Sequence, residues 1–376
     1  MNVLMLHCTA DLYGSSRILL NVVEIMRKKG YQIIAVLPEE GPLKMELEKL
    51  GAEVRIINLG ILRRKYFTTW GLIGRIFLWK MAFFKLTVLV ISKKINLIYS
   101  NTSGVIVGAA VAAITRKKHF WHIHEIIEKP RILAKIIGWF TRATDKVILV
   151  SEAVKTAWLP YIDATRMVVI HNGIDHVERS ANGSTLKKEL GLSEETILIG
   201  MIGRVLYWKG QLYFLEIAGI LHQNFPNVNF VLVGDAFPGY EYLYQEIANK
   251  ITSLNLTELV HDLGYRTDTA NILSGLDLFV SPSTMPDPFP TVILEAMACG
   301  TPIAATKHGG VLEMIEDNQS GIFLPINEAE KAAQLIAVLL ENTEKRIKMG
   351  KEAQILQQNR FTKALFEKDI CRLLAD

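Results

Sequence analysis

SPSTMPDPFPTVILEAMACGTPIAATKHGG, residues 281–310, holds the end of one apolar strand, a proline-rich loop, an apolar helix and a second strand. Pro288 and Pro290 disfavour helix for the residues before them, and Pro290 suits the position just ahead of a first helical turn. We therefore predict that Asp287 lies in the loop and that Glu295 lies on the helix. A strand, a helix and a second strand in this order are typical of a parallel sheet covered by helices.

The same alternation of short β-branched runs and helix-length segments extends along the whole chain. In the first half, strands are predicted at residues 2–7, 32–37, 54–59, 97–100, 119–124, 146–151 and 167–172. A polar stretch at 176–195, which we interpret as a linker, precedes a second set at 197–203, 229–235, 259–264, 276–283, 302–307 and 321–326. The expected fold class is α/β, with two doubly wound domains whose ligands bind at the carboxyl ends of the strands.

Length and composition agree with two domains. The chain has 376 residues, 50% of them hydrophobic, so it can bury a large core. Its three cysteines are too few and too scattered for a disulfide framework or a zinc site, and its first residues lack the pattern of a secretory signal, so a cytoplasmic protein is expected. The net charge of +4 combines a basic first half, which could meet phosphates or anionic lipid, with an acidic second half. No recognition motif supports nucleic-acid binding.

The helix that follows the proline-rich loop offers a site for an anion. Its first backbone N–H groups, near Thr291 and Val292, have no partner within the helix. A phosphate there, with Asp287 and Glu295 reaching toward the two ends of the ligand, would suit a diphosphate that carries hydroxyls on both sides, as a nucleotide-sugar does. The alternative is a surface loop and a solvated glutamate.

A second candidate site is GRVLYWKG, residues 203–210, which directly follows a predicted strand. Arg204 can bind phosphate oxygens through two N–H groups, and Lys209 adds a mobile point charge. Together they would stabilise a diphosphate leaving group as negative charge grows on it. Two solvated cations in a loop are the alternative.

Two features of the first half could also bind a ligand. In HFWHIHEI, residues 119–126, alternation places His122 and His124 on one face of a strand, and His124 lies nearer the carboxyl end, where it could bind a sugar hydroxyl. A structural role is the alternative, and we prefer it for His122. In ADLYGSSRILLNVV, residues 10–23, Gly14 would let the backbone approach a ligand, or simply make a tight turn. This segment lacks the GxGxxG fingerprint of dinucleotide oxidoreductases.

These pieces, in this order, resemble glycosyltransferase family 4, whose members have the GT-B fold. The decisive match is D-x7-E, from Asp287 to Glu295, which resembles the E-x7-E motif of the family. Supporting matches are GRVLYWKG, VIHNGID (169–175), LVSEAV (149–154) and LGYR (263–266). The resemblance is specific over residues 197–325 and weaker in the first half.

The resemblance implies two Rossmann-like domains that face each other across a cleft. Residues 1–180 would bind the acceptor, residues 181–358 would bind the nucleotide-sugar donor, and a helix at 359–376 would pack back on the first domain. For the donor, it implies that Arg204 and Lys209 hold the diphosphate, that Glu295 binds the ribose and that Asp287 binds the sugar. Sugar and phosphate would also be contacted by Pro288, Phe289, Thr291 and Val292, and the base would be bordered by Tyr265 and Arg266. In the first domain, His124 and Gly14 would belong to the active site.

The implied reaction is a retaining, metal-independent and cofactor-free transfer of a sugar from a nucleoside diphosphate to an acceptor hydroxyl. His124, Asp287, Arg204 and Lys209 would take the catalytic roles. Two alternatives remain open at this point: a nucleotide-sugar 2-epimerase of the same architecture, and a non-catalytic nucleotide-sugar-binding subunit. The chain departs from the family pattern at Asp287, where Glu is more frequent, and at Pro290, where many members have Gly. The shorter acid puts the identity of the donor sugar in doubt.

The segment 61–94 combines cations with Trp and Phe in the basic half. A helix of this kind can lie in a membrane interface, although it can equally be a core helix with basic edges. Three cations interrupt its apolar run, so it does not read as a spanning helix. We therefore expect a lipid-linked or polysaccharide-precursor acceptor and a location either in the cytoplasm or peripherally on the inner face of the plasma membrane.

Overall fold

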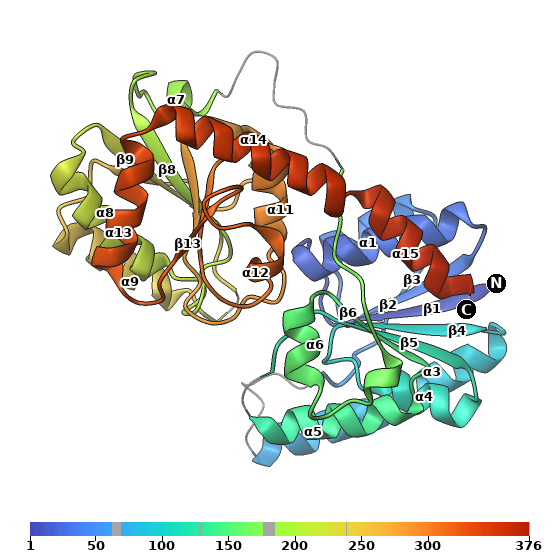
Figure 1. Cartoon of the computed structure of the whole chain (residues 1–376). Helices are drawn as coiled ribbons and strands as arrows, with labels where there is room; N and C mark the ends of the chain where they lie inside the picture. The colour runs from blue at the N-terminus through green and yellow to red at the C-terminus, as the bar shows by residue number, and fades with distance from the viewer. Residues whose placement is uncertain (62–68, 128–129, 176–184, 238, 376) are drawn as a thin grey trace. The chain divides into compact units, whose positions relative to one another are not determined.

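The structure of the protein, a computed structural model, describes residues 1–61, 69–127, 130–175, 185–237 and 239–375. The chain divides into two compact units. Unit 1 contains Met1–Asn172 and Phe366–Asp376, and unit 2 contains Gly173–Leu365. Each unit is a parallel sheet with helices packed on both of its faces (Figure 1).

Unit 1 is built on a seven-stranded sheet in the order β3-β2-β1-β4-β5-β6-β7. All pairings are parallel, and His7 at the end of β1 lies opposite Asn101 at the end of β4. The central strands are apolar and buried because helices cover both faces. The strands are β1 (Asn2–His7), β2 (Gln32–Leu37), β3 (Glu53–Ile56), β4 (Leu97–Asn101), β5 (Lys118–Ile123), β6 (Lys146–Leu149) and β7 (Met167–Val169).

Two hydrophobic layers enclose this sheet. Val22 of α1, Leu43 of α2 and Phe366 pack on one face, and Leu86 of α3 and Val111 of α4 pack on the other. The helices of its described residues are α1 (Gly14–Lys28), α2 (Pro42–Lys49), α3 (Thr69–Ser92), α4 (Val107–Thr115), α5 (Arg131–Phe140) and α6 (Glu152–Trp158), together with the short 3-10 helices η2 (Thr141–Ala143) and η3 (Ala164–Arg166).

The last helix, α15 (Lys363–Ala375), packs in unit 1, although α14 (Thr343–Arg360) before it belongs to unit 2. Phe366, Ile370 and Leu373 lie four and three residues apart, so they share one helix face, and all three are buried in the unit 1 core. The predicted C-terminal helix is therefore part of unit 1, but it begins later than predicted because α14 continues to Arg360.

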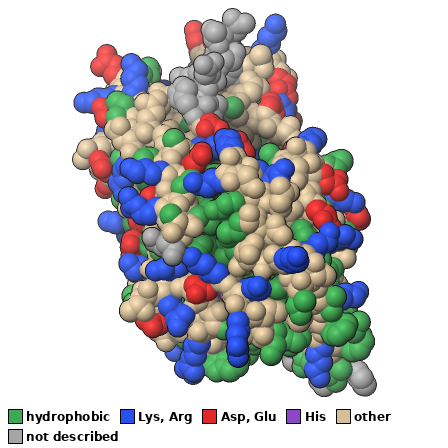
Figure 2. Space-filling model, turned by 90° about the vertical axis from the view of Figure 1, so that its right-hand side faces the viewer, with side chains coloured by type: hydrophobic (Ala, Val, Ile, Leu, Met, Phe, Trp, Pro, Cys, Tyr) green, Lys and Arg blue, Asp and Glu red, His purple; other side chains and the backbone are tan. Residues whose placement is uncertain are grey.

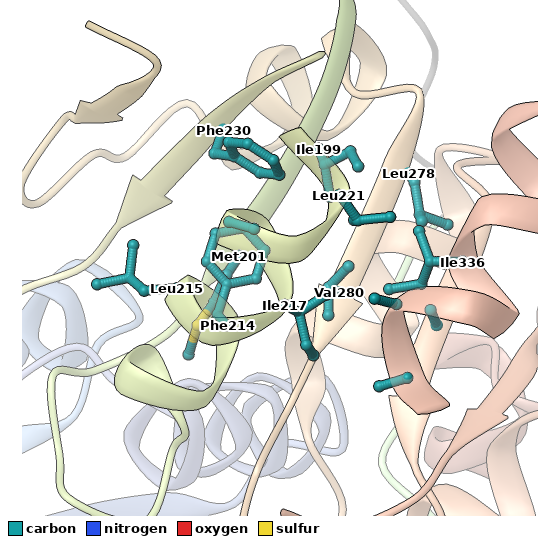
Figure 3. Packing of buried hydrophobic residues seen from close by; sticks show 14 of the residues in the cluster. Ile199, Met201, Phe214, Leu215, Ile217, Leu221, Phe230, Leu278, Val280 and Ile336 are labelled. Carbon is teal, nitrogen blue, oxygen red and sulfur yellow. The ribbon is translucent and has the colours of Figure 1, made fainter. Parts of the chain in front are cut away.

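Unit 2 has a six-stranded parallel sheet in the order β10-β9-β8-β11-β12-β13. Figure 3 shows part of its core, where Phe214 and Leu221 of α8 and Ile336 of α13 pack against strand residues such as Met201 and Val280. The elements are α7 (Leu186–Glu189), β8 (Ile197–Ile202), α8 (Gln211–Asn224), β9 (Val228–Val233), α9 (Tyr242–Ser253), β10 (Val260–Asp262), α10 (Thr269–Gly275), β11 (Leu278–Ser281), α11 (Thr291–Ala298), β12 (Ile303–Thr306), α12 (Val311–Met314), β13 (Ile322–Leu324), α13 (Ala329–Leu340) and α14.

The predicted fold class is confirmed, and a strand is present at each predicted run. Most strands end one to three residues earlier than predicted; β5, for example, ends at Ile123, so His124 is the first residue of the following loop. Part of the predicted linker lies outside the described residues, at 176–184, while α7 occupies another part of it. The two units meet in sequence at Asn172 and Gly173, earlier than the predicted boundary at 180.

Both sheets reverse their strand order at one point. In unit 1 the reversal lies between β1 and β4, and in unit 2 it lies between β8 and β11. In open parallel sheets, ligands bind outside the carboxyl ends of the strands at such a reversal, because the loops there diverge to opposite faces and leave room. The fold alone therefore selects the residues after β1 and β4, and after β8 and β11, as the places to search for function.

Helix α3 fills most of the apolar segment that was predicted either to contact a membrane or to pack in the core. Ala82, Leu86 and Val90 face the core, whereas Phe77 and Phe84 on the other side are exposed. Of the helices in the described part of the chain, none is long and apolar enough to span a bilayer.

Candidate active site

Two loops of unit 2 meet at the reversal between β8 and β11. The first follows β8 and contains GRVLYWKG, and the second follows β11 and contains Asp287. Thr284 in the second loop donates its backbone N–H to the carbonyl of Trp208 in the first, at 2.8 Å. The side chain of Gln211, at the start of α8, donates to the carbonyl of Arg204 at 2.8 Å. The two loops are thus tied to each other and to a helix.

Lys209 and Asp287 form an ion pair across these loops. Lys209 Nζ lies 2.5 Å from Asp287 Oδ2, and their side chains are only 19% and 7% exposed. The amine also lies 4.6 Å from the centre of the Trp208 ring, in reach of a cation–π interaction. Because Lys209 contacts Oδ2, the other carboxylate oxygen of Asp287 can still accept a hydrogen bond from a ligand hydroxyl.

The backbone around Asp287 is held in place by two glycines. Gly310 donates its N–H to the carbonyl of Asp287 at 2.8 Å. Gly309 has a φ of +61°, and a Cβ there would lie 2.3 Å from the same carbonyl oxygen. At Gly310 a Cβ would lie 2.0 Å from the carbonyl oxygen of Pro288. The approach is possible only because both residues lack a side chain.

Helix α11 begins at Thr291, directly after Pro290, as the sequence predicts. No side chain caps its first turn, which contains no acid. The Ile293 N–H donates to the Pro290 carbonyl at 3.1 Å. Thr291 and Glu295 lie four residues apart and are half-buried, so they share one helix face. Phe289 is buried against Phe361 and is a packing residue in this structure.

Arg204 and Arg266 have different surroundings. The Arg204 guanidinium is half-buried and lies 5.0 Å from the centre of the Phe237 ring. Arg266 is bound on two edges, at 2.5 Å by Glu189 and at 2.8 Å by Asp268. These carboxylates raise the pKa of Arg266, and the Arg266 guanidinium in turn lowers the pKa of Asp268. Arg266 therefore ties α7 to the loop before α10, and Tyr265 beside it is the exposed residue of the pair.

In unit 1 a chain of polar side chains crosses the reversal between β1 and β4. His124 Nε2 lies 2.8 Å from Asn101 Oδ1, and Asn101 Nδ2 lies 2.9 Å from His7 Nδ1. His7 Nε2 in turn lies 2.9 Å from Ser16 Oγ, which donates to Asp11 at 3.1 Å. The network joins the ends of β1, β4 and β5 to the start of α1.

One carbonyl decides the direction of every hydrogen bond in this network. Asn101 Nδ2 also lies 3.1 Å from the carbonyl oxygen of Ser15, which can only accept. The amide nitrogen of Asn101 must therefore point toward Ser15 and His7, and its oxygen toward His124. It follows that His7 Nδ1 accepts a hydrogen bond and that His124 carries its proton on Nε2. His124 Nδ1 is then left unprotonated.

Burial keeps the imidazoles at this site neutral. Burial lowers the pKa of His7 to about 4 against the opposing effect of Asp11 and Asn101, and lowers the pKa of His122 to about 3. For His124, burial and then the nearby His122 and His7 rings hold the pKa well below 6.5. The His122 and His124 rings lie 4.1 Å apart, and His122 bonds Tyr99 at 2.8 Å. A neutral His124 can exchange hydrogen bonds with sugar hydroxyls at neutral pH.

The sequence analysis missed His7, Asn101, Ser16 and Asp11. The available signal was position, because His7 ends one predicted strand and Asn101 directly follows another. It could be used only once the strand order had placed these two positions side by side. Gly14 was predicted to form a glycine turn, but it is the first residue of α1. Over the described ranges, no group of three or more His, Cys, Asp or Glu side chains is arranged to hold a metal ion.

Two family models match the chain, and together they span most of its length. Residues 13–178 match glycosyltransferase family 4, and residues 183–355 match the glycosyl transferases group 1. The chain belongs to this family of glycosyltransferases. As a family 4 glycosyltransferase, it is an enzyme, and its two parallel-sheet units form the GT-B fold.

Three relatives illustrate this family 4 membership. The UDP-Gal:alpha-D-GlcNAc-diphosphoundecaprenol alpha-1,3-galactosyltransferase of Escherichia coli is 27% identical over 338 residues, which are 85% of this chain and 82% of that protein. The N,N'-diacetylbacillosaminyl-diphospho-undecaprenol alpha-1,3-N-acetylgalactosaminyltransferase of Campylobacter jejuni is 32% identical over 166 residues, 44% of this chain and 41% of that protein. HepE of Anabaena, solved in complex with UDP-glucose, superimposes with a TM-score of 0.87 at 27% identity and covers 100% of this chain and 99% of its own.

Proposed function

We propose that this glycosyltransferase moves a sugar from a uridine diphosphate sugar to a hydroxyl of a lipid-linked glycan, with retention of configuration at the transferred carbon. Support for the donor comes from HepE, which was solved with UDP-glucose, and from the UDP-Gal of the Escherichia coli relative's name. Support for the acceptor comes from the two relatives named for sugars on diphosphoundecaprenol. Unit 2 would bind the donor and unit 1 the acceptor.

The observation that carries the proposal is the Lys209–Asp287 pair at the switch point of the unit 2 sheet. A cation paired with Asp287, in the loop that leads into α11, suits a diphosphate, because the amine and the N-terminus of the helix both favour negative charge. The carboxylate suits the sugar hydroxyls attached to that diphosphate. Arg204, in the same loop as Lys209, would bind the second phosphate, and Glu295 would bind the ribose.

In the proposed reaction, the bond from the sugar's anomeric carbon to the diphosphate oxygen breaks, and a bond from the acceptor oxygen forms on the same face. The acceptor proton passes to the departing phosphate oxygen, so no side chain needs to act as a nucleophile. Lys209, Arg204 and the start of α11 stabilise the charge that grows on the diphosphate. Asp287 and the neutral His124 orient the sugar hydroxyls.

The short Asp287 side chain would contribute to donor choice. Its carboxylate is held against Lys209 and by the backbone contact with Gly309, so it cannot shift toward a distant hydroxyl without losing the ion pair. A donor whose hydroxyl reaches Asp287 directly should bind better than one that needs an intervening water. A screen of UDP-sugars by calorimetry would identify that donor.

Removing Lys209 tests the role of the ion pair in turnover. Lys209→Met should lower kcat by about 100-fold, the usual effect of losing one group that stabilises transition-state charge. Lys250→Met is the matched control, because Lys250 makes a partly exposed ion pair with Glu216 at 2.8 Å on helices of the same unit. Turnover is measured with the preferred UDP-sugar and a lipid-diphosphate glycan acceptor.

The stability of both variants must be measured as well, because Lys209→Met leaves the buried Asp287 carboxylate without its partner. The double variant Lys209→Met/Asp287→Asn removes that unpaired charge and should regain stability without regaining turnover. If Lys209→Met turns over as fast as Lys250→Met, Lys209 does not stabilise the leaving group.

A further inference from the structure

Unit 1 exposes an apolar surface that crosses from α3 to α5. On α3 the exposed residues recur at helical spacing: Ile73, Ile76, Phe77, Met81, Phe84, Val88 and Ile91. Trp79 of α3 lies 6.3 Å from Phe140 at the end of α5, between ring centres, and Phe140 lies 4.9 Å from Trp139. Phe84 is 67% exposed and Trp139 is 60% exposed, so this apolar surface meets solvent.

A helix on the surface of a globular protein normally turns a polar face to water, and large exposed apolar patches mark interaction sites. Figure 2 shows hydrophobic side chains mixed with Lys and Arg along the lower edge of the molecule, the level at which α3 and α5 lie in Figure 1. Neither helix contains Asp or Glu, whereas both contain Lys and Arg. A second copy of this face would oppose cation to cation, so charge favours an anionic partner.

A basic hollow of about 650 Å³ adjoins this apolar surface. It lies at the starts of β5 and β6, where η2 follows directly on α5 and packs against α4. The charged residues that line it are Arg116, Lys117, Lys118, Arg142, Arg166 and Asp145. The hollow therefore has five cations and one acid.

Some of the charged groups that line the hollow also make contacts within the protein, and these contacts hold them in place. Asp145 accepts the backbone N–H of His119 at 2.7 Å, and Arg166 donates to the carbonyl of Thr144. Lys118 Nζ lies 5.2 Å from the centre of the Phe120 ring. Arg116 and Arg142, on either side, are exposed and can turn toward a ligand.

We propose that this hollow binds the phosphate headgroup of an anionic bilayer lipid while the apolar faces of α3 and α5 enter the membrane interface. The inference deepens the proposed function, because it supplies a membrane surface from which a lipid-linked acceptor is reached. The hollow is distinct from the catalytic residues. It lies at the amino ends of the strands, and His124 lies at the carboxyl end of β5, about 20 Å away along a six-residue strand.

Vesicle sedimentation with the full chain tests the hollow. The variant is Arg116→Asn/Arg142→Gln, in which Asn suits the positive φ of 52° at position 116. Each cation near an anionic surface contributes about fivefold in affinity, so the variant should bind vesicles of phosphatidylcholine and phosphatidylglycerol about 30-fold more weakly. The control, Lys348→Gln/Lys351→Gln on α14 of unit 2, removes the same charge and should bind like the wild type. An equal loss in both variants, or none in either, would overturn the proposal.

Two further vesicle-binding experiments follow. One asks whether the phosphate comes from a lipid or from a soluble molecule, and the other tests the apolar part of the surface. Glycerol phosphate, added at the headgroup concentration of the vesicles, should leave binding unchanged because it carries no acyl chains; displacement would show that the site takes a soluble phosphate instead. Phe77→Ser/Phe84→Ser should weaken binding to vesicles with and without phosphatidylglycerol, because it removes apolar contact rather than charge. Retained binding by this variant would reject insertion of α3.

Donor hydrolysis and transfer to a soluble acceptor, measured on the same variants, keep this inference separable from the proposed function. Arg116→Asn/Arg142→Gln should keep wild-type turnover under these conditions. If the wild type shows no turnover while the vesicle results hold, the proposed reaction is wrong and the lipid site stands. If turnover is present and the vesicle results fail, the lipid site is wrong and the proposed reaction stands.

Discussion

At the scale of single residues, His124 depends on Asn101 more than on its immediate chain neighbours. The amide oxygen of Asn101 accepts from His124 Nε2, and its nitrogen is held by His7 and by the Ser15 carbonyl. The orientation of this one amide determines which nitrogen of His124 carries a proton. In the proposed reaction, Asn101 would be a positioning residue, whose effect on turnover would pass through His124.

Replacing Asn101 by Asp should make turnover sensitive to pH. A carboxylate next to His124 and His7 favours their charged forms, so it should raise their pKa values toward neutrality, and kcat should fall as pH drops from about 8 to about 6. The wild type should show no such fall in this range, because the pKa of His124 is held well below 6.5. A merely structural role of Asn101 would lower kcat equally at each pH.

Asn229→Asp is the matched control for this profile. Asn229 is a second buried asparagine, and it lies 2.9 Å from His261, whose pKa burial also lowers. This pair lies on β9 and β10, away from the switch points. Its substitution should leave the pH dependence of turnover unchanged. A flat profile in Asn101→Asp would show that Asn101 does not act through His124.

At the scale of elements, the loop after β11 has the shape it needs because a second loop presses against it. Gly309 and Gly310 follow β12 and meet the backbone of Asp287 and Pro288 at distances that admit no Cβ. The prolines around Asp287 restrict the loop from within, and the glycine pair restricts it from outside. The position of the carboxylate is thus set by two neighbouring strands and their loops.

Gly309→Ala should lower kcat by about 100-fold, because the Cβ must push away the Asp287 carbonyl and thereby displace the carboxylate. Gly191→Ala is the control, since Gly191 has a similar φ of +68° and no atom within 4 Å of its Cβ position. Gly191→Ala should lose about 1 kcal/mol of stability from backbone strain alone, and Gly309→Ala should lose more because the clash with Asp287 adds to that strain, as urea unfolding can measure. Equal kcat values for the two variants would contradict the role assigned to the glycine contact.

At the scale of the molecule, the two units differ in their buried histidines. Unit 1 buries His7, His119 and His122 and half-buries His124, and burial lowers the pKa of His119 to about 3. Because the folded pKa values lie below the unfolded value of 6.5, the unfolded chain takes up protons as pH falls while the folded chain does not. Stability is therefore complete above about pH 6.5 and is lost on acidification toward pH 4.

Native-state hydrogen exchange at pH 7.5 and pH 5, followed peptide by peptide, should show a larger loss of protection in unit 1 than in unit 2. Each buried neutral histidine should contribute up to about 1.4 kcal/mol per pH unit to the free energy of unfolding. His119→Gln should reduce this pH slope in unit 1. Equal acid sensitivity of the two units would contradict this account.

Local patterns in the sequence were enough to predict the strands, the loop position of Asp287 and the helical position of Glu295. Strand alternation and proline chemistry are short-range, so they act before any packing is known. The family pattern likewise indicated Arg204 and Lys209, because both lie within one short motif. The first and last residues of the strands were less certain, since they depend on which neighbour each strand pairs with.

The packed structure was needed for everything that joins distant segments. Lys209 and Asp287 are 78 positions apart, and His7 and Asn101 are 94 apart, so only the strand order brings each pair together. Packing of distant segments also produces the ion pair of Arg266 with Glu189, the contact of Gly309 with Asp287, and the hollow beside α5. Periodicity specifies which face of an element is buried, but the partner of that face is chosen by the free energy of packing the whole chain, which no short stretch contains.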